Sequence, residues 1–376
     1  MRVVSIVGAR PQFVKLAPVS RAMSAASEEG EGTVEDIIVH TGQHYDTAMS
    51  DVFFDELQIP RPAVHLDIGS GSHGAQTGKM LEAVESTLLE TSPDMVVVYG
   101  DTNSTAAGAL AAAKLKIPIA HIEAGLRSFN RGMPEEINRI VADHISDLLL
   151  APTETAMENL RREDLIERSF NTGDVMLDAV LFNSELAEQK SNILEEMKLA
   201  PGEYAVATLH RPVNTDEGNL VRVLDILAEV ATKHIPIVFP AHPRTTAILD
   251  SGSVSWSAPD ELMITEPLGY LDMLKLLRHA RLALTDSGGL QKEALFLDTP
   301  CITLREETEW PETIEAGGNV LTGSNRDKIL KAVETWLSPG SEPTVTGDAG
   351  AAPFGDGTAA TQIVNRIIDF QTDRAA

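Results

Sequence analysis

Short runs of apolar residues recur along the whole chain, and most are continuous rather than alternating with polar residues. A continuous apolar run is typical of a parallel strand that helices cover on both faces. Amphipathic stretches, such as residues 107–116 and 219–234, lie between these runs. The predicted strands are residues 3–8, 36–40, 95–100, 117–122, 147–152, 204–210, 235–240, 262–267, 281–286, 300–304 and 319–323. Strands that alternate with helices predict an α/β fold with parallel sheets.

The strand–helix pattern runs through the chain twice, with a seam between residues 172 and 202. At 376 residues the chain also exceeds the ~250–300 residues at which single cores stop growing. We therefore predict two Rossmann-like domains that face one another, residues 1–175 and 176–359. Residues 360–376 are predicted to form a helix that packs back on the first domain. It follows a long connection, rich in Pro, Gly, Ala and Thr, at 338–359.

The charge balance is strongly acidic, because 30 Lys and Arg residues stand against 56 Asp and Glu residues, a formal net charge of −26. Such a surface repels nucleic acid and anionic membranes, so neither is predicted as a partner. The acidic residues are scattered, which favours a surface adapted to high salt; a merely acidic protein is the alternative. With no apolar run near ~18 residues and a single cysteine, Cys301, we expect a soluble cytoplasmic protein without disulfides.

Polar side chains follow nearly every predicted strand. In open α/β sheets, ligands bind beyond the carboxyl ends of the strands, so these side chains are candidates for a site. They are Arg10, Lys15, Asp101, Glu123, Arg127, Glu135, His210, Arg211, His242, Arg244, Asp286 to Gly289, and Arg305.

The cations and glycines among them suit an anion of phosphate type. The stretch TDSGGLQKEA (285–294) predicts a strand, a glycine turn and a helix, whose N-terminal N–H groups can bind a diphosphate. Arg10, Lys15, His210 and Arg305 would supply the opposing charge. The alternatives are an ordinary helix cap at 285–294 and a surface salt bridge for each basic residue.

Three carboxylates, Asp101, Glu123 and Glu135, belong to the same end of the first predicted sheet. Carboxylates beside a phosphate are costly because like charges repel, so their presence favours proton transfer or binding of sugar hydroxyls. For Glu135 an equally good alternative is a place in the first turn of a helix, favoured by the helix dipole.

Two motifs are rejected. GSGSHG (69–74) has the spacing of a dinucleotide fingerprint, but it does not open the first strand–helix turn, so no NAD(P) is predicted. HIE (121–123) has the H-x-E spacing of zinc deaminases, but no P-C-x-x-C can follow in a chain with one cysteine. We therefore predict neither a cofactor nor a metal.

In nine segments the chain resembles the non-hydrolysing UDP-N-acetylglucosamine 2-epimerases. They are GARPQFVKLAP, TGQHYD, YGDTNST, HIEAGLRSFNRGMPEEINR, GDVMLDA, LHRPVNTD, TDSGGLQKEA, LREETEWPE and FGDGTA, and they span nearly the whole chain. The resemblance implies a glycosyltransferase-B-like architecture, with two Rossmann-like domains around a central cleft, and a homodimer. It also implies interconversion of UDP-N-acetylglucosamine and UDP-N-acetylmannosamine, by elimination of UDP to 2-acetamidoglucal and re-addition.

The resemblance assigns roles to individual residues. It implies that Asp101, Glu123 and Glu135 are acid/base groups, that His210 assists at the diphosphate, and that Glu293 binds the ribose. Leu268 and Met273 would line the uracil. The residues that would bind the rest of UDP are Arg10, Lys15, Ser287, Gly288, Gly289 and Arg305. Which carboxylate removes the proton and which returns it stays open.

Departures from the family pattern leave alternatives. Gln12 and Phe13 in RPQF, with GQHYD, also resemble epimerases of UDP-2,3-diacetamido-uronic acids. Gln43, Glu136 and His242 match a second, activating UDP-sugar site of some bacterial members, whereas Asp46 and GSGSHG do not match its other contacts. A two-domain glycosyltransferase, dependent on an acceptor, and a UDP-sugar sensor without turnover are the other hypotheses. The three carboxylates favour an epimerase over a sensor.

Overall fold

The computed structural model describes residues 1–29, 34–43, 54, 56–211, 214, 216–250, 256–338 and 352–375. Contacts divide the chain into two units, residues 1–179 with 353–376, and residues 180–352. The first unit thus ends at Ala179, where the sequence placed the boundary at 175. It resumes at Pro353, where the sequence placed the return at 360. Most of the predicted connection 338–359 lies outside the described residues.

In its described part, the first unit contains a seven-stranded parallel sheet with the order β3-β2-β1-β4-β5-β6-β7. The strands are β1 Arg2–Val7, β2 Glu35–His40, β3 Val64–His65, β4 Met95–Tyr99, β5 Ile119–Ile122, β6 Leu148–Ala151 and β7 Ser169–Asn171. Five of them are confirmed predictions. The prediction missed β3 and β7, which are two and three residues long and therefore carry no readable hydrophobic period.

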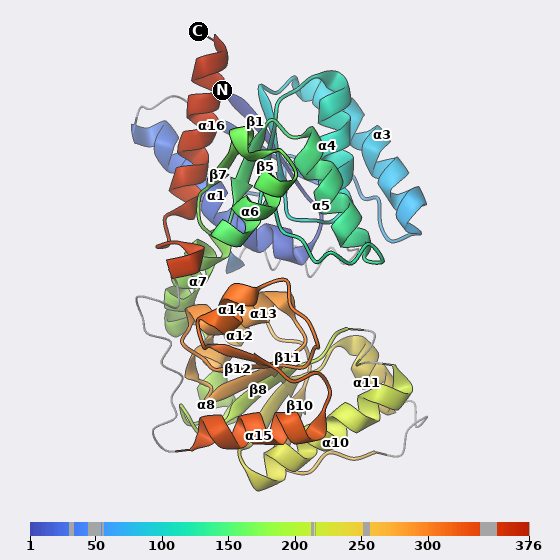
Figure 1. Cartoon of the computed structure of the whole chain (residues 1–376), viewed down its shortest axis with the longest axis vertical. Coiled ribbons are helices and arrows are strands. Elements are labelled where there is room, and N and C mark those ends of the chain that lie inside the picture. The colour runs from blue at the N-terminus through green and yellow to red at the C-terminus, as the bar shows by residue number, and fades with distance from the viewer. Residues whose placement is uncertain are drawn as a thin grey trace. The chain divides into compact units, whose positions relative to one another are not determined.

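Helices cover both faces of this sheet (Figure 1). The described helices from the first unit are α1 Arg10–Glu29, α3 His73–Thr91, α4 Asn103–Leu115, α5 Pro134–Ile145, α6 Glu154–Arg162, η1 Ile166–Arg168 and α16 Ala359–Ala375, with η2 Ala352–Phe354 before α16. Helix α7, Val175–Lys190, begins in this unit and continues into the second. On one face, Val84 and Leu88 of α3 and the alanines of α4 pack on strand side chains such as Val98. Helices α1 and α16 pack against each other on the other side.

The described part of the second unit contains a six-stranded parallel sheet with the order β10-β9-β8-β11-β12-β13. The strands are β8 Ala205–Thr208, β9 Ile237–Pro240, β10 Leu262–Thr265, β11 Leu282–Thr285, β12 Cys301–Thr303 and β13 Asn319–Leu321. The helices are α8 Ile193–Met197, α10 Glu217–Lys233, α11 Pro243–Asp250, α12 Tyr270–His279, α13 Gly288–Phe296, α14 Pro311–Glu315 and α15 Arg326–Leu337.

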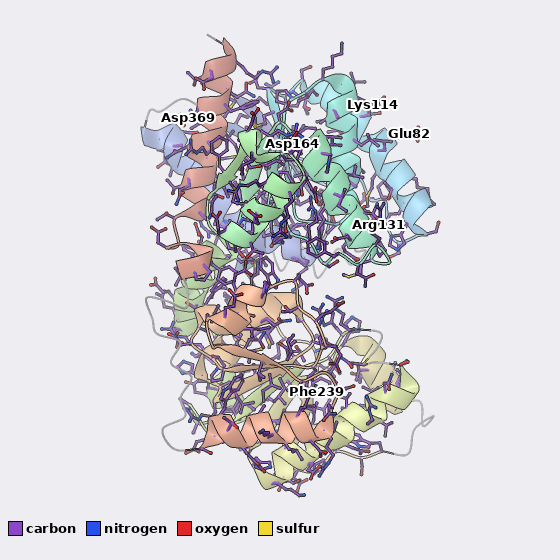
Figure 2. All side chains as sticks on the ribbon, in the orientation of Figure 1. Glu82, Lys114, Arg131, Asp164, Phe239 and Asp369 are labelled. Carbon is purple, nitrogen blue, oxygen red and sulfur yellow. The ribbon has the colours of Figure 1, made fainter. Side chains whose placement is uncertain are left out.

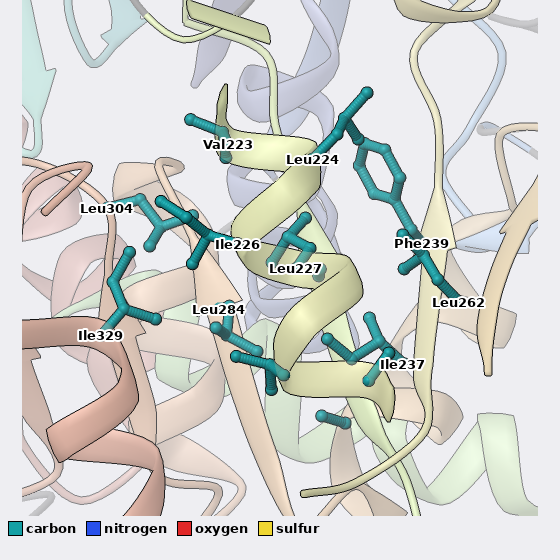
Figure 3. Close-up of a cluster of buried hydrophobic side chains, with 14 of the residues drawn as sticks. Val223, Leu224, Ile226, Leu227, Ile237, Phe239, Leu262, Leu284, Leu304 and Ile329 are labelled. Atoms are coloured by element: carbon teal, nitrogen blue, oxygen red, sulfur yellow. The ribbon is translucent and has the colours of Figure 1, made fainter. Parts of the chain in front are cut away.

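Alternate strand residues of the second unit pack into separate cores, because successive side chains of a strand point to opposite faces. Ala205 and Ala207 belong to the cluster that α10 and α15 close, whereas Val206 packs with α8 and α12. Figure 3 shows Leu224 of α10 beside Phe239 of β9, with Leu227 and Ile237 in the same cluster. Strands buried on both faces explain why the apolar runs in the sequence are continuous.

Both sheets have the strand order of a Rossmann fold, so the predicted α/β class is confirmed. The order reverses between β1 and β4 in the first unit and between β8 and β11 in the second. Ligands bind beyond the carboxyl ends of the strands at such switch points. The loops after these four strands are therefore the places to look for chemistry.

Charged side chains such as Glu82 on α3, Lys114 on α4 and Asp369 on α16 project from the outer faces of the helices (Figure 2). Within the described residues, no helix combines the length and the apolar character needed to cross a membrane.

Candidate active site

Glu123 and Lys15 form a buried ion pair at the carboxyl end of the first sheet, beside the switch point. Oε2 of Glu123 binds Nζ of Lys15, and the two side chains are 7% and 11% exposed. Glu123 follows β5 and has a φ of +68°, a left-handed conformation that is uncommon for a residue with a side chain. Strained residues of this kind cluster at functional sites.

Gly100 makes room for this pair. Its φ is +61°, and a Cβ at this position would lie 3.1 Å from Oε2 of Glu123 and 3.2 Å from Nζ of Lys15. A side chain here would therefore be strained and would also press on both charged groups. The turn after β4 thus depends on glycine both for its conformation and for space.

Asp101, the next residue, is held by α5. Its carboxylate binds Nη2 of Arg139, and its backbone carbonyl accepts a hydrogen bond of 3.0 Å from Nδ2 of Asn138. The Arg139 side chain is 5% exposed, and its Nη1 lies 3.1 Å from Oε2 of Glu136. The side chain of Asp101 remains 32% exposed, so its carboxylate is fixed in position while still open to a ligand.

Glu136 and Glu135 are adjacent in sequence but lie in different environments. Glu136 is buried and accepts hydrogen bonds of 2.9 Å from the N–H groups of Ser128 and Phe129, so it shapes the loop before α5. Glu135 lies in the first turn of α5 and is exposed. The first-turn alternative for Glu135 is therefore correct as to position, and this position leaves its carboxylate accessible.

His121, on β5, links the site to a buried chain of charges. Its Nε2 lies 2.7 Å from the carbonyl oxygen of Gly100, and its Nδ1 lies 2.7 Å from Oδ1 of Asp143. The ring thus connects the turn after β4 to a fully buried carboxylate of α5. Arg127 contacts Oδ2 of Asp143 at 2.7 Å and binds both carboxylate oxygens of Glu163 at 2.7 Å. Arg127, a strand-end candidate, is thus a buried structural residue.

The turn after β1 carries the other candidates of the first unit. Arg10 is exposed at the start of α1. Gln12 is buried; its Oε1 accepts from the N–H of Gly8 at 2.8 Å, and its Nε2 donates to the carbonyl of Tyr99 at 2.9 Å. The amide thereby joins the turn after β1 to the end of β4. A glutamate at this position could accept the first hydrogen bond but, when ionised, could not donate the second.

In the second unit, Asp286 organises the residues that follow β8. It is fully buried, and its Oδ1 lies 2.8 Å from Nδ1 of His210. Its Oδ2 accepts from the N–H of Arg211 at 3.0 Å and from Nδ2 of Asn214 at 3.0 Å. Burial opposes ionisation, but these hydrogen bonds and the charge of His210 hold the pKa of Asp286 below its ordinary value. Nε2 of His210, whose side chain is 46% exposed, is left for a ligand.

The glycine turn after β11 forms the predicted helix start. Ser287 caps α13, its side chain accepting from the N–H of Leu290 at 3.3 Å, and Gly288 and Gly289 form the first turn. First-turn N–H groups have no partner within their helix, and the helix dipole favours an anion there. Arg305 follows β12, and its Nη1 lies 2.7 Å from Oε2 of Glu309.

The remaining candidates are placed as follows. Leu268 and Met273, on either side of the start of α12, pack on one apolar cluster of the second unit. Glu293 is buried on α13. Oε1 of Gln43 accepts from Oγ of Ser104 at 2.7 Å, at the start of α4. His242 is exposed after β9, and the side chain of Arg244 and residue Asp46 are among those not described.

Each unit thus presents one half of the predicted chemistry. The first has carboxylates held by cations, and the second has a helix start, a histidine and arginines suited to a diphosphate. Within the described residues, no group of three or more His, Cys, Asp or Glu side chains could hold a metal ion. Sequence reasoning missed four residues that position the candidates. Gly100 makes room for the Glu123–Lys15 pair, Arg139 binds Asp101, Asp286 binds His210, and Glu309 binds Arg305.

Comparison with known proteins identifies the family. The sequence pattern described as UDP-N-acetylglucosamine 2-epimerase matches residues 27–368. The chain belongs to this family. A protein of Methanococcus maripaludis, named as a UDP-N-acetylglucosamine 2-epimerase homolog, is 50% identical over 97% of this chain and 98% of its own length.

Two further members of this 2-epimerase family are similar over nearly the whole chain. The UDP-2,3-diacetamido-2,3-dideoxy-D-glucuronate 2-epimerase of Pseudomonas aeruginosa is 44% identical over 98% of this chain and 99% of its own. The crystal structure of the Methanocaldococcus jannaschii UDP-GlcNAc 2-epimerase, in complex with UDP-GlcNAc and UDP, matches with a TM-score of 0.87 and 43% identity. That match covers 98% of this chain and all of the other. The predicted family is confirmed, while the homodimer stays a prediction.

Proposed function

We propose that the protein is a non-hydrolysing epimerase that interconverts UDP-N-acetylglucosamine and UDP-N-acetylmannosamine. A carboxylate takes the proton from C2, and the C1–O bond breaks with its electron pair on the departing UDP. The product of this elimination, 2-acetamidoglucal, stays bound. A proton then adds to the opposite face of C2, and the diphosphate oxygen of UDP forms the bond to C1 again.

The observation that carries the proposal is the pair of cation-held carboxylates at the carboxyl end of the first sheet. Asp101 is fixed by Arg139, and Glu123 is fixed by Lys15. A general acid or base must be held at the reacting atom, and an ion pair with a buried cation supplies that positioning. Glu135, exposed on α5, is the third candidate of the same end. These three residues fill the acid/base roles in our proposal.

The second unit would hold the nucleotide. The first turn of α13 at Gly288 and Gly289, with Arg305, suits the diphosphate, because helix N–H groups and a guanidinium both favour an anion. His210 is fixed through Nδ1 by Asp286, so it would meet the leaving diphosphate through Nε2. Charge that develops on departing UDP is stabilised by donors already in place.

A second candidate substrate is a UDP-2,3-diacetamido-uronic acid. The Pseudomonas aeruginosa relative bears this activity in its name and is 44% identical to the chain. The chemistry at C2 would be the same, because both sugars carry an acetamido group there. The two candidates differ in the group on C5 and in the substituent on C3.

Turnover of each nucleotide sugar alone tests the proposal. The protein is incubated with UDP-N-acetylglucosamine, and separately with the diacetamido-uronic acid, and the sugars are separated by anion-exchange chromatography. We expect UDP-N-acetylmannosamine from the first substrate, with UDP still attached. Free N-acetylmannosamine with UDP would make the enzyme a hydrolysing one. Reaction only with an added acceptor would favour a glycosyltransferase, and binding without product would favour a sensor.

A further inference from the structure

The carboxylate of Glu309 lies between two arginines beside the glycine turn of the second unit. Its Oε2 is 2.7 Å from Nη1 of Arg305, and its Oε1 is 3.3 Å from Nη2 of Arg211. The side chains of Glu309 and Arg305 are 13% and 10% exposed. Arg305, the arginine proposed to bind the diphosphate, is therefore already paired with a carboxylate of the protein, that of Glu309.

The same carboxylate lies next to the start of α13. A Cβ on Gly288 would lie 3.2 Å from Oε1 of Glu309, so the carboxylate stands directly against the first residue of that helix. Burial opposes its ionisation, but the charges of Arg305 and Arg211 hold the pKa of Glu309 below its ordinary value. An ionised carboxylate thus occupies the surroundings, two guanidinium groups and a helix start, that suit a diphosphate.

We propose that Glu309 is a positioning residue that stands in for the diphosphate in the free protein and competes with it for Arg305 and Arg211. This inference rests on the proposed function, since it concerns the same nucleotide half-site. In the free protein the carboxylate keeps the two guanidinium groups from repelling each other. In the complex it opposes the diphosphate and so limits the affinity for UDP.

Two effects of Glu309 on UDP binding have opposite signs. Holding the arginines in place favours binding, because fewer rotamers are lost when the ligand arrives. The negative charge disfavours binding, because a diphosphate carries at least two negative charges and charge repulsion is strong in a half-buried site. Ordering two side chains is the smaller effect, so the charge decides the sign. Removing the charge should therefore tighten binding.

A moderate affinity for UDP suits a reaction in which UDP is eliminated and added back. UDP must stay bound while the sugar is free of it, and the UDP-sugar product must then leave. Arg305 and Arg211 without a nearby negative charge would bind the UDP-sugar product too tightly. Release of the product would then limit turnover.

Glu309→Gln tests the proposal, with Glu307→Gln as the matched control. Both variants remove one negative charge from the same loop, but Glu307 is exposed to solvent. Titration calorimetry with UDP should give a Kd about tenfold lower for Glu309→Gln than for wild type. Glu307→Gln should stay near wild type. With UDP-N-acetylglucosamine as substrate, both the KM and the kcat of Glu309→Gln should fall. Partial loss of structure would lower kcat without lowering KM. Weaker or unchanged UDP binding by folded Glu309→Gln would overturn the proposal.

A double variant keeps the charge balance if Glu309→Gln alone folds poorly. Arg211→Gln with Glu309→Gln removes one charge of each sign, so UDP affinity should return toward that of wild type. An affinity as high as that of Glu309→Gln would contradict the charge explanation. Wild-type protein that fails to bind UDP at all would sink the proposed function instead, so the two failures are distinguishable.

Discussion

Nδ1 of His210 lies 2.8 Å from Oδ1 of Asp286, and the ring therefore presents Nε2 to whatever binds after β8. A carboxylate only accepts, so Nδ1 carries hydrogen. Asp286 also binds the N–H of His210 at 3.1 Å, which fixes the backbone as well as the ring. The tautomer of His210 and its orientation thus depend on one fully buried carboxylate.

Replacing Asp286 with Asn should slow turnover by about 10²–10⁴-fold, because the amide can donate to Nδ1 and favour the wrong tautomer. Steady-state kinetics measures the effect, and UDP calorimetry checks that the half-site still binds. Asp286 acts through His210, so Asp286→Asn in a His210→Ala background should cost little more than His210→Ala alone. Fully additive losses would mean that Asp286 has a separate role.

The buried pair of Asp143 and His121 should make stability depend on pH in the acid range. Burial opposes ionisation of Asp143, but the hydrogen bond and charge of His121, with Arg127, hold its pKa below the ordinary 3.8. A lowered folded pKa gives stability that is fully present above the unfolded value and is lost as pH falls through the folded value.

Asp143→Asn should therefore reduce the free energy of unfolding at pH 7 by about 3–5 kcal/mol, because it breaks the buried ion pair with Arg127, which then keeps only Glu163. The difference from wild type should shrink as the pH falls from 3.8 through the lowered folded pKa, because the unfolded carboxylate takes up its proton first and the folded one follows at lower pH. Urea unfolding at several pH values measures this. A difference that stays constant with pH would show that the charge of Asp143 does not matter.

Gly100→Ala should abolish most activity, because the added Cβ presses on the Glu123–Lys15 pair. Gly202→Ala is the matched control: its φ of +77° carries similar backbone strain, but a Cβ there meets nothing within 4 Å. Both variants should lose stability in urea unfolding through backbone strain, Gly100→Ala by somewhat more because of its close contacts. Only Gly100→Ala should lose turnover, and equal activity of the two would place the reacting carboxylate elsewhere.

The net charge of −26 should make the melting temperature rise with salt. Repulsion among surface carboxylates is screened as the Debye length falls to ~3 Å at 1 M. Calorimetric scans from low salt to molar KCl measure the shift. A melting temperature that does not change over this range would contradict a surface adapted to high salt. The proposed enzymatic function would not be affected by that result.

Much of the fold could be predicted from the sequence because its strands are buried on both faces. Residues 95–100 read as a strand, and β4 Met95–Tyr99 is completely buried. The short strands β3 and β7 escaped because pairing with a neighbouring strand defines them, and pairing is a long-range property. The seam near 172–202 contains α7, a helix of 16 residues that runs across the unit boundary.

The sequence was enough to predict which side chains at the strand ends belong to the candidate site, but not which residues bind them. Asp101 and Glu123 come soon after β4 and β5 in the sequence, so the rule that ligands bind beyond the carboxyl ends of the strands was enough to select them. Their cations are not predictable in this way, because Arg139 comes from α5 and Lys15 from α1. Arg127 also follows a strand, yet it points into a buried charge network, which no local pattern reveals.

Epimerisation in D₂O tests the central claim most directly. UDP-N-acetylglucosamine is incubated with the wild-type protein in D₂O, and the UDP-N-acetylmannosamine formed is analysed by NMR and mass spectrometry. Elimination and re-addition predict one solvent deuterium at C2 of the product, because the proton removed by Asp101, Glu123 or Glu135 exchanges before another is returned. Each of these residues changed to its amide should lose about 10²–10⁴-fold in turnover while UDP still binds. A product that retains the original hydrogen at C2 would contradict the mechanism.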